Sequence, residues 1–81
     1  MEFTVAMALA LQERINVSQR PQMLGYFKFS HLPEKLQQIS SEFARLAVYI
    51  DTLPNNPEST TALRKLLEAK DCAVRSELWG G

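Results

Sequence analysis

The segment LPEKLQQISSEFARLAVYIDTLPNNPESTTALRKLL, residues 32–67, decides the fold. Twice in this segment a proline is followed by a glutamate, at Pro33–Glu34 and at Pro57–Glu58. Proline suits the first position of a helix, where its missing N–H is not needed, and an acidic side chain in the first turn interacts favourably with the helix dipole. The two starts therefore predict two helices, separated by PNNP at residues 54–57.

Large apolar residues in the first predicted helix recur at alternating spacings of three and four. They are Leu36, Ile39, Phe43, Leu46, Ile50 and Leu53. This spacing is that of a heptad seam, which packs against a neighbouring helix. Because the connection between the two helices is short, they are expected to be antiparallel neighbours. The sequence thus predicts an all-α fold, in which a helical hairpin over residues 27–81 follows an N-terminal arm or short helix and connector over residues 1–26.

The second predicted helix carries an apolar arc that covers close to half of its circumference. Its members are Ala62, Leu63, Leu66, Leu67, Ala69, Ala73 and Val74. One partner helix does not cover so wide an arc, and a chain of 81 residues buries only a modest core by itself. Cys72 is the only cysteine, which excludes a disulfide and fits a reducing cytoplasm. We therefore expect a cytoplasmic homo-oligomer.

Charge and composition exclude several functions. Nine basic and nine acidic residues cancel, so no net field attracts a DNA or RNA polymer or a membrane. The single histidine, His31, is expected to cap a helix or to hydrogen-bond, and one histidine with one cysteine does not form a tetrahedral metal site. We expect no enzyme, no metal and no cofactor, and any anion must be recognised by local groups.

The N-terminal stretch FTVAMALALQ, residues 3–12, is too short and too closely flanked by charges to span a bilayer. We expect a short amphipathic helix or strand-like arm. Its packing residues are Phe3, Met7, Leu11 and Ile15. The following SQRPQMLG, residues 18–25, is expected to be an irregular connector because proline and glycine interrupt regular structure.

Lys70 falls inside the apolar arc of the second helix, and three interpretations stay open. Its methylenes could lie along apolar surface with the charge at the edge, or it could fix the register of an oligomer at a seam position. It could also meet an anion between subunits, with Glu42 or Asp51 of a neighbouring chain as alternative partners. An unpaired, fully buried ammonium is excluded, because its desolvation costs several kcal/mol.

Aromatic residues cluster just before the first long helix, at Tyr26, Phe27 and Phe29. They either pack on the hairpin or form a platform on which a planar base stacks beside cations. Ser40 and Ser41 are expected to face solvent or to bond to the backbone, with ligand donation as the alternative.

An exposed stripe is expected on the second helix. It contains Arg64, Glu68, Asp71 and Arg75. Asp71 and Arg75 have the favourable i,i+4 order, and Arg75 could reach a phosphate if two such stripes face each other. Cys72, at the edge of the apolar arc, is expected to act as a small hydrophobe.

Residues 27–78 resemble the small hairpin domain of phage anti-defence sponge proteins, the anti-CBASS and Thoeris anti-defence hairpin family. The matching features are an aromatic residue at Phe29, the helix start at Pro33–Glu34, packing residues in both helices, and the Leu53–Pro54 turn. The resemblance implies a phage protein in the host cytoplasm that assembles, typically as a hexamer, and sequesters cyclic oligonucleotide second messengers without cleaving them.

The same resemblance implies a cyclic di- or trinucleotide bound between subunits, with a base stacked on Phe29. The candidate ligand-binding residues are Phe27, Phe29, Lys35, Ser40, Ser41, Lys70 and Arg75. A rival interpretation is a structural or protein-interaction hairpin that oligomerises and binds no small molecule.

Overall fold

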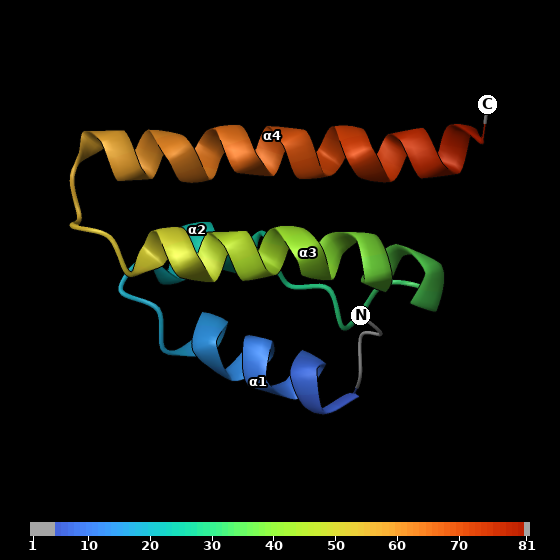
Figure 1. The fold of residues 1–81 in the computed structure, drawn as a ribbon, viewed down its shortest axis with the longest axis horizontal. Coiled ribbons are helices and arrows are strands. Elements are labelled where there is room, and N and C mark those ends of the chain that lie inside the picture. Colours follow the sequence, from blue (N-terminus) through green and yellow to red (C-terminus); the bar gives the residue numbers. More distant parts are fainter. Residues whose placement is uncertain (1–4, 81) are drawn as a thin grey trace.

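A computed structural model describes residues 5–80, and for Val5 and Ala8 only the backbone. Over this range the chain forms four helices and no strand: α1 (Val5–Asn16), α2 (Pro21–Gly25), α3 (Glu34–Asp51) and α4 (Pro57–Trp79). Helices α3 and α4 form the predicted antiparallel hairpin, while α1 packs on the opposite side of α3 from α4 (Figure 1). The all-helical prediction is therefore confirmed.

The start of α4 follows the sequence pattern closely. Asn56 is the N-cap, and its side chain accepts a hydrogen bond of 2.9 Å from the Ser59 backbone N–H. The Ser59 hydroxyl in turn accepts from the Asn56 N–H at 3.2 Å, which completes a capping box with serine in the position usually taken by glutamate or glutamine. At the other end, Gly80 terminates α4 in the left-handed conformation, with φ of 73°, as is common after a helix.

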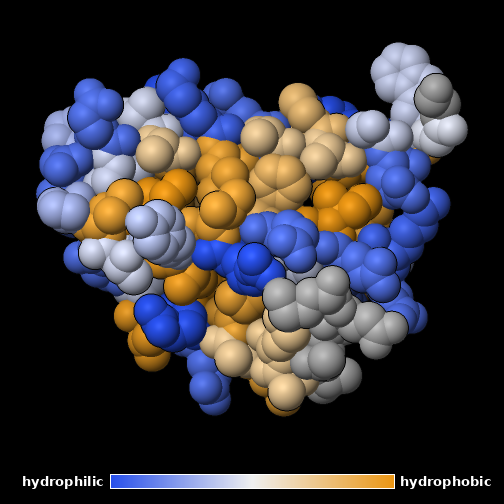
Figure 2. Space-filling view, in the orientation of Figure 1, coloured by the Kyte–Doolittle hydropathy of each residue, from blue (hydrophilic) through white to orange (hydrophobic). Residues whose placement is uncertain are grey.

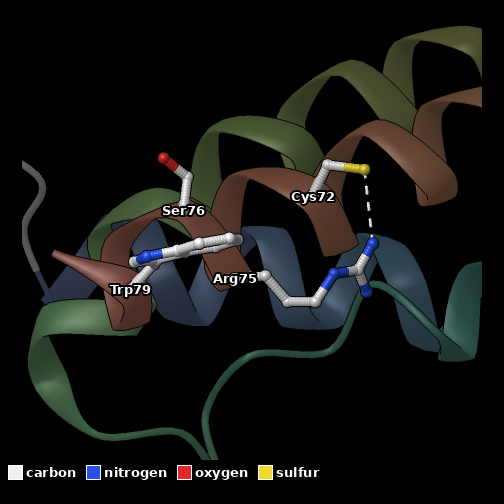
Figure 3. A pocket seen from close by; sticks show the side chains of 4 residues that line it. All are labelled: Cys72, Arg75, Ser76 and Trp79. Atoms are coloured by element: carbon white, nitrogen blue, oxygen red, sulfur yellow. Dashed lines mark hydrogen bonds between the residues drawn. The ribbon is translucent and has the colours of Figure 1, made fainter. Parts of the chain in front are cut away.

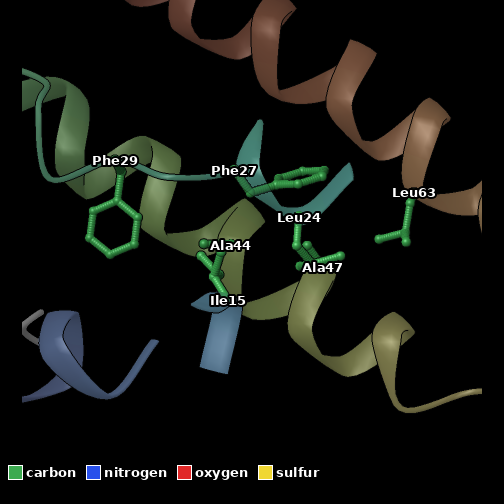
Figure 4. Packing of buried hydrophobic residues seen from close by; sticks show 7 residues of the cluster. All are labelled: Ile15, Leu24, Phe27, Phe29, Ala44, Ala47 and Leu63. Carbon is green, nitrogen blue, oxygen red and sulfur yellow. The ribbon is translucent and has the colours of Figure 1, made fainter. Parts of the chain in front are cut away.

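The core joins the N-terminal segment to the hairpin (Figure 4). It consists of Ile15, Leu24, Phe27, Phe29, Ala44, Ala47 and Leu63. The stripe predicted for the N-terminal segment is confirmed in part, since Ile15 is buried and Met7 and Leu11 are half-buried, whereas Phe3 lies outside the described residues. The connector prediction was wrong for residues 21–25, because Pro21 begins the short helix α2, whose Leu24 reaches the core.

The face that α3 buries differs from the predicted seam. Its buried residues are Leu36, Ser40, Ser41, Ala44 and Ala47, which are mostly small. Phe43 and Ile50 are only half-buried against the core, and Leu46 is 52% exposed. The small side chains allow α1 and the Phe27–Phe29 segment to approach α3 closely, so that the line of large residues lies toward the outer edge.

Arg20 closes the turn between the two long helices. Its five guanidinium N–H donors match five acceptors in the turn: Asn55 Oδ1, the Asp51 carbonyl and carboxylate, the Pro54 carbonyl and the Ser59 hydroxyl. The Arg20 residue is only 8% exposed. A cation at the last carbonyls of α3 also interacts favourably with the negative end of the helix dipole.

Replacing Arg20 by methionine is expected to destabilise the fold by about 3–5 kcal/mol, because the half-buried Asp51 carboxylate and the turn carbonyls lose their partner. Urea denaturation followed by circular dichroism measures the change. The matched control Arg14→Met alters an exposed arginine on α1 and should shift stability by less than about 0.5 kcal/mol. Equal stability of the two variants would contradict a structural role for Arg20.

Candidate ligand-binding site at the open end of the hairpin

The predicted stacking residues Phe27 and Phe29 lie in the core. They are 0% and 1% exposed, and Figure 4 shows both rings among the other core side chains. A buried ring has no free face for a nucleobase, so the described protomer offers no stacking platform here. The sequence left open whether these rings pack on the hairpin or form a stacking platform, and in the protomer they pack in the core.

Ser40 and Ser41 also lie on the buried face of α3, so the expectation of solvent-facing hydroxyls was wrong. The Ser41 hydroxyl donates to the Gln38 carbonyl at 2.9 Å, which is the back-bonding alternative. The Ser40 hydroxyl has no hydrogen-bond partner among the described residues. Neither hydroxyl is accessible to a ligand in the protomer.

Lys70 bonds within its own chain. Its ammonium donates to the Tyr26 carbonyl at 2.7 Å, lies 3.6 Å from the Asp71 carboxylate and sits 5.8 Å from the centroid of the Phe27 ring. Its side chain is 13% exposed. The position of Lys70 in the apolar arc is therefore explained by these three partners, which are a carbonyl, a carboxylate and an aromatic ring of the same chain.

Lys35 and Arg75, by contrast, are exposed and lie at the same end of the hairpin. The Lys35 ammonium pairs with Glu77 at 2.9 Å, so the first turn of α3 lies beside the last turns of α4. Arg75 does not pair with Asp71 as the i,i+4 pattern suggested, since its Nη2 donates to Cys72 Sγ at 3.3 Å. Cys72 is exposed, which corrects its assignment as a small packing residue.

An open groove of about 490 Å³ runs along the last turns of α4. It is lined by Cys72, Arg75, Ser76 and Trp79. Because these positions are three, four and seven residues apart, they share one face of the helix. Figure 3 shows the Trp79 ring lying back along α4 beside Ser76, with the Arg75 guanidinium reaching toward Cys72.

The groove combines two groups that recognise nucleotides. Trp79 is 87% exposed, and an indole has the largest aromatic face of any side chain on which a base can stack. Arg75 supplies a planar guanidinium that can donate two parallel hydrogen bonds to a phosphate. Sequence reasoning identified Arg75 but missed Trp79, although the i,i+4 spacing of these two residues could have indicated the pair.

Other kinds of site receive no support from the described residues. None of the described helices is long and apolar enough to cross a membrane. Within residues 5–80, no three His, Cys, Asp or Glu side chains are grouped so that they could hold a metal ion. His31 is exposed at the turn before α3.

Comparison of the sequence with protein-family models gives no match, and comparisons with curated proteins and with solved structures give none either. The similarity to the anti-defence hairpin family therefore stays a prediction. The site described above rests on its own geometry.

Replacing Lys70 by methionine is expected to cost about 1–3 kcal/mol of stability, because it removes a charged hydrogen bond and a cation–π contact while keeping the length of the side chain. Thermal unfolding followed by circular dichroism measures this. The control Lys28→Met changes an exposed lysine and should be nearly neutral. A fully stable Lys70→Met protein would show that the contacts to Tyr26 and Phe27 contribute little.

Proposed function

We propose that this chain is a non-catalytic binding protein that sequesters a cyclic oligonucleotide signal. Copies of the chain associate, with a hexamer as the expected assembly, and hold the ligand intact so that it does not reach its effector. The observation that carries this proposal is the groove in which the exposed indole of Trp79 lies beside the guanidinium of Arg75. The likeness of residues 27–78 to the anti-defence hairpin family supports the same conclusion.

The chemistry of a cyclic dinucleotide suits this groove. A base stacked on Trp79 contributes about 1–3 kcal/mol, and the bridging phosphate accepts charge-assisted hydrogen bonds from Arg75. The volume of about 490 Å³ lies within the roughly 300–1,000 Å³ that is usual for small-molecule sites. Lys35, which is exposed and pairs with Glu77, adds a second cation at this end.

The shape of the groove suggests why more than one copy takes part. All of the side chains that line it come from α4, so it has one wall and an open side. Two such grooves that face each other would enclose a ligand with two bases and two phosphates, each base on one Trp79 and each phosphate on one Arg75. A twofold axis between copies matches the approximate twofold symmetry of a cyclic dinucleotide.

A second function, that of a structural or protein-interaction hairpin without a small-molecule ligand, is favoured by a different observation. Three of the predicted ligand residues make contacts within the protomer, namely Phe27, Phe29 and Lys70. The two functions differ in one measurement, which is whether any cyclic nucleotide binds.

Isothermal titration with cyclic di- and trinucleotides and cyclic ADP-ribose isomers, with the linear dinucleotide as the control ligand, tests sequestration. Because Trp79 is the only tryptophan, quenching of its fluorescence reports stacking directly. Trp79→Ala should weaken binding about 10-fold or more, as expected for the loss of base stacking, and Arg75→Gln should have a comparable effect. The control Arg64→Gln, an exposed arginine on α4, should leave the affinity unchanged.

Ligand recovered by heating the complex should be chemically intact by chromatography, because sequestration breaks no bond. Absence of binding across the panel would leave the interaction hairpin as the function. Binding that persists in Trp79→Ala but is lost in the conservative Phe29→Leu variant would return the stacking role to Phe29. Hydrolysed ligand would exclude sequestration.

A further inference from the structure

Asp71 lies between two cations on α4. At about 100° of rotation per residue, Lys70 is about 100° from Asp71 on one side of the helix, and Arg75 is about 40° from it on the other. Arg75 in turn lies between Asp71 and Cys72, which is about 60° further round. Asp71 therefore has two cations within reach on its own helix, and Arg75 has two acceptors, a carboxylate and a thiol.

Asp71 and Arg75 each take the partner that lies away from the other. Asp71 Oδ1 lies 3.6 Å from Lys70 Nζ, whereas Arg75 Nη2 donates to Cys72 Sγ at 3.3 Å, as the dashed line in Figure 3 shows. Within residues 5–80, Arg75 is in no ion pair. The carboxylate that the i,i+4 spacing offers to Arg75 is thus directed toward Lys70.

The surroundings of Lys70 explain why it attracts this carboxylate. Its ammonium donates to the Tyr26 carbonyl at 2.7 Å, and its side chain is largely buried. Figure 2 shows apolar side chains gathered between α4 and α3 on one face of the molecule. A charge that is held among apolar groups is screened by salt much less than an exposed one, so Lys70 attracts Asp71 more strongly than the exposed Arg75 does.

The partner of Arg75 decides what an arriving phosphate must displace. A thiol is a weak acceptor without charge, so the hydrogen bond to Cys72 is given up at little cost. A carboxylate forms a charge-assisted hydrogen bond with a guanidinium, which is roughly twice as strong as a neutral one, and it also repels a phosphate. An Arg75 paired with Asp71 would therefore bind phosphate less well than Arg75 in its observed arrangement.

We infer that Lys70 is a positioning residue for the groove. By holding the Asp71 carboxylate, it keeps the Arg75 guanidinium without a carboxylate partner and open to a phosphate oxygen. The residues that line the groove do not include Lys70, so its effect on an anion passes through Asp71. The inference rests on the proposed function, because it concerns how the same Arg75 meets the phosphate of a ligand.

Titration with inorganic phosphate at constant ionic strength tests this inference. The nuclear magnetic resonance signal of the Arg75 side-chain Nε–H reports binding, and its loss in Arg75→Gln assigns it. Lys70→Met should weaken phosphate binding at Arg75 about twofold, which is the effect of one i,i+4 ion pair. The matched control Lys28→Met removes an exposed lysine and measures the effect of losing one positive charge, which should be smaller.

Further variants separate positioning from a structural role of Lys70. In the double variant Lys70→Met/Asp71→Asn the twofold loss should disappear, because no carboxylate remains to pair with Arg75. Lys70→Arg keeps a cation at this position and should retain the native affinity. Asp71→Asn alone should strengthen phosphate binding no more than Glu68→Gln, which removes another exposed carboxylate of α4, because Asp71 is already held away from Arg75.

Circular dichroism checks that each variant is folded, and if Lys70→Met unfolds, the comparison of Asp71→Asn with Glu68→Gln still decides. The inference is overturned if Asp71→Asn alone strengthens phosphate binding several-fold, or if Lys70→Met and Lys28→Met have equal effects. A loss that persists in the double variant, or a native Arg75 signal that does not respond to phosphate, also overturns it. If the expected order of phosphate affinities is found but no cyclic nucleotide binds, the proposed function is wrong and the positioning role of Lys70 stands.

Discussion

The hairpin depends on the guanidinium of Arg20. At the turn between α3 and α4 the chain must reverse direction while the last carbonyls of α3 lack partners within the helix. Arg20 donates to the carbonyl of Asp51 at the end of α3, to the carbonyl of Pro54 in the turn, and to the side chains of Asp51, Asn55 and Ser59. Since Ser59 also completes the capping box of α4, one side chain links the end of one helix to the start of the next. All five of its N–H groups are used, which leaves Arg20 no donor for a ligand.

This arrangement determines which face of α3 is covered. Arg20 immediately precedes α2, so fixing it at the turn brings Leu24 and then Phe27 and Phe29 across the small residues of α3. The aromatic rings fill the space above Ala44 and Ala47, which small side chains leave open. Among the large residues that repeat in heptads, Phe43 and Ile50 therefore remain half-buried and Leu46 is 52% exposed.

The cations of the chain are divided between structural and accessible positions. Arg20 and Lys70 are largely buried, and each donates a hydrogen bond to a backbone carbonyl of its own chain. Lys35 and Arg75 lie at the opposite end of the hairpin from the Arg20 turn, where they are exposed. With equal numbers of acidic and basic residues in the chain, an anion is attracted by such a local group and not by the net charge.

The sequence alone determined the two long helices and the connection between them. Local signals set these features: proline and glutamate at the helix starts, Asn56 as a cap, and the short turn that makes α3 and α4 antiparallel. These features depend on residues that are close in the sequence, so their physical causes can be read from it.

Only the tertiary structure decided which surfaces are buried and what each polar group binds. A heptad pattern predicts that α3 packs against a neighbouring helix. It does not say whether the small residues of α3 or its large apolar residues face the core, because that depends on how α1 and the Phe27–Phe29 segment pack on α3. In the same way, Lys70 meets the Tyr26 carbonyl from 44 residues away, and Arg20 meets Ser59 from 39 residues away. Such partners are brought together by the packing of the whole chain, and no local pattern specifies them.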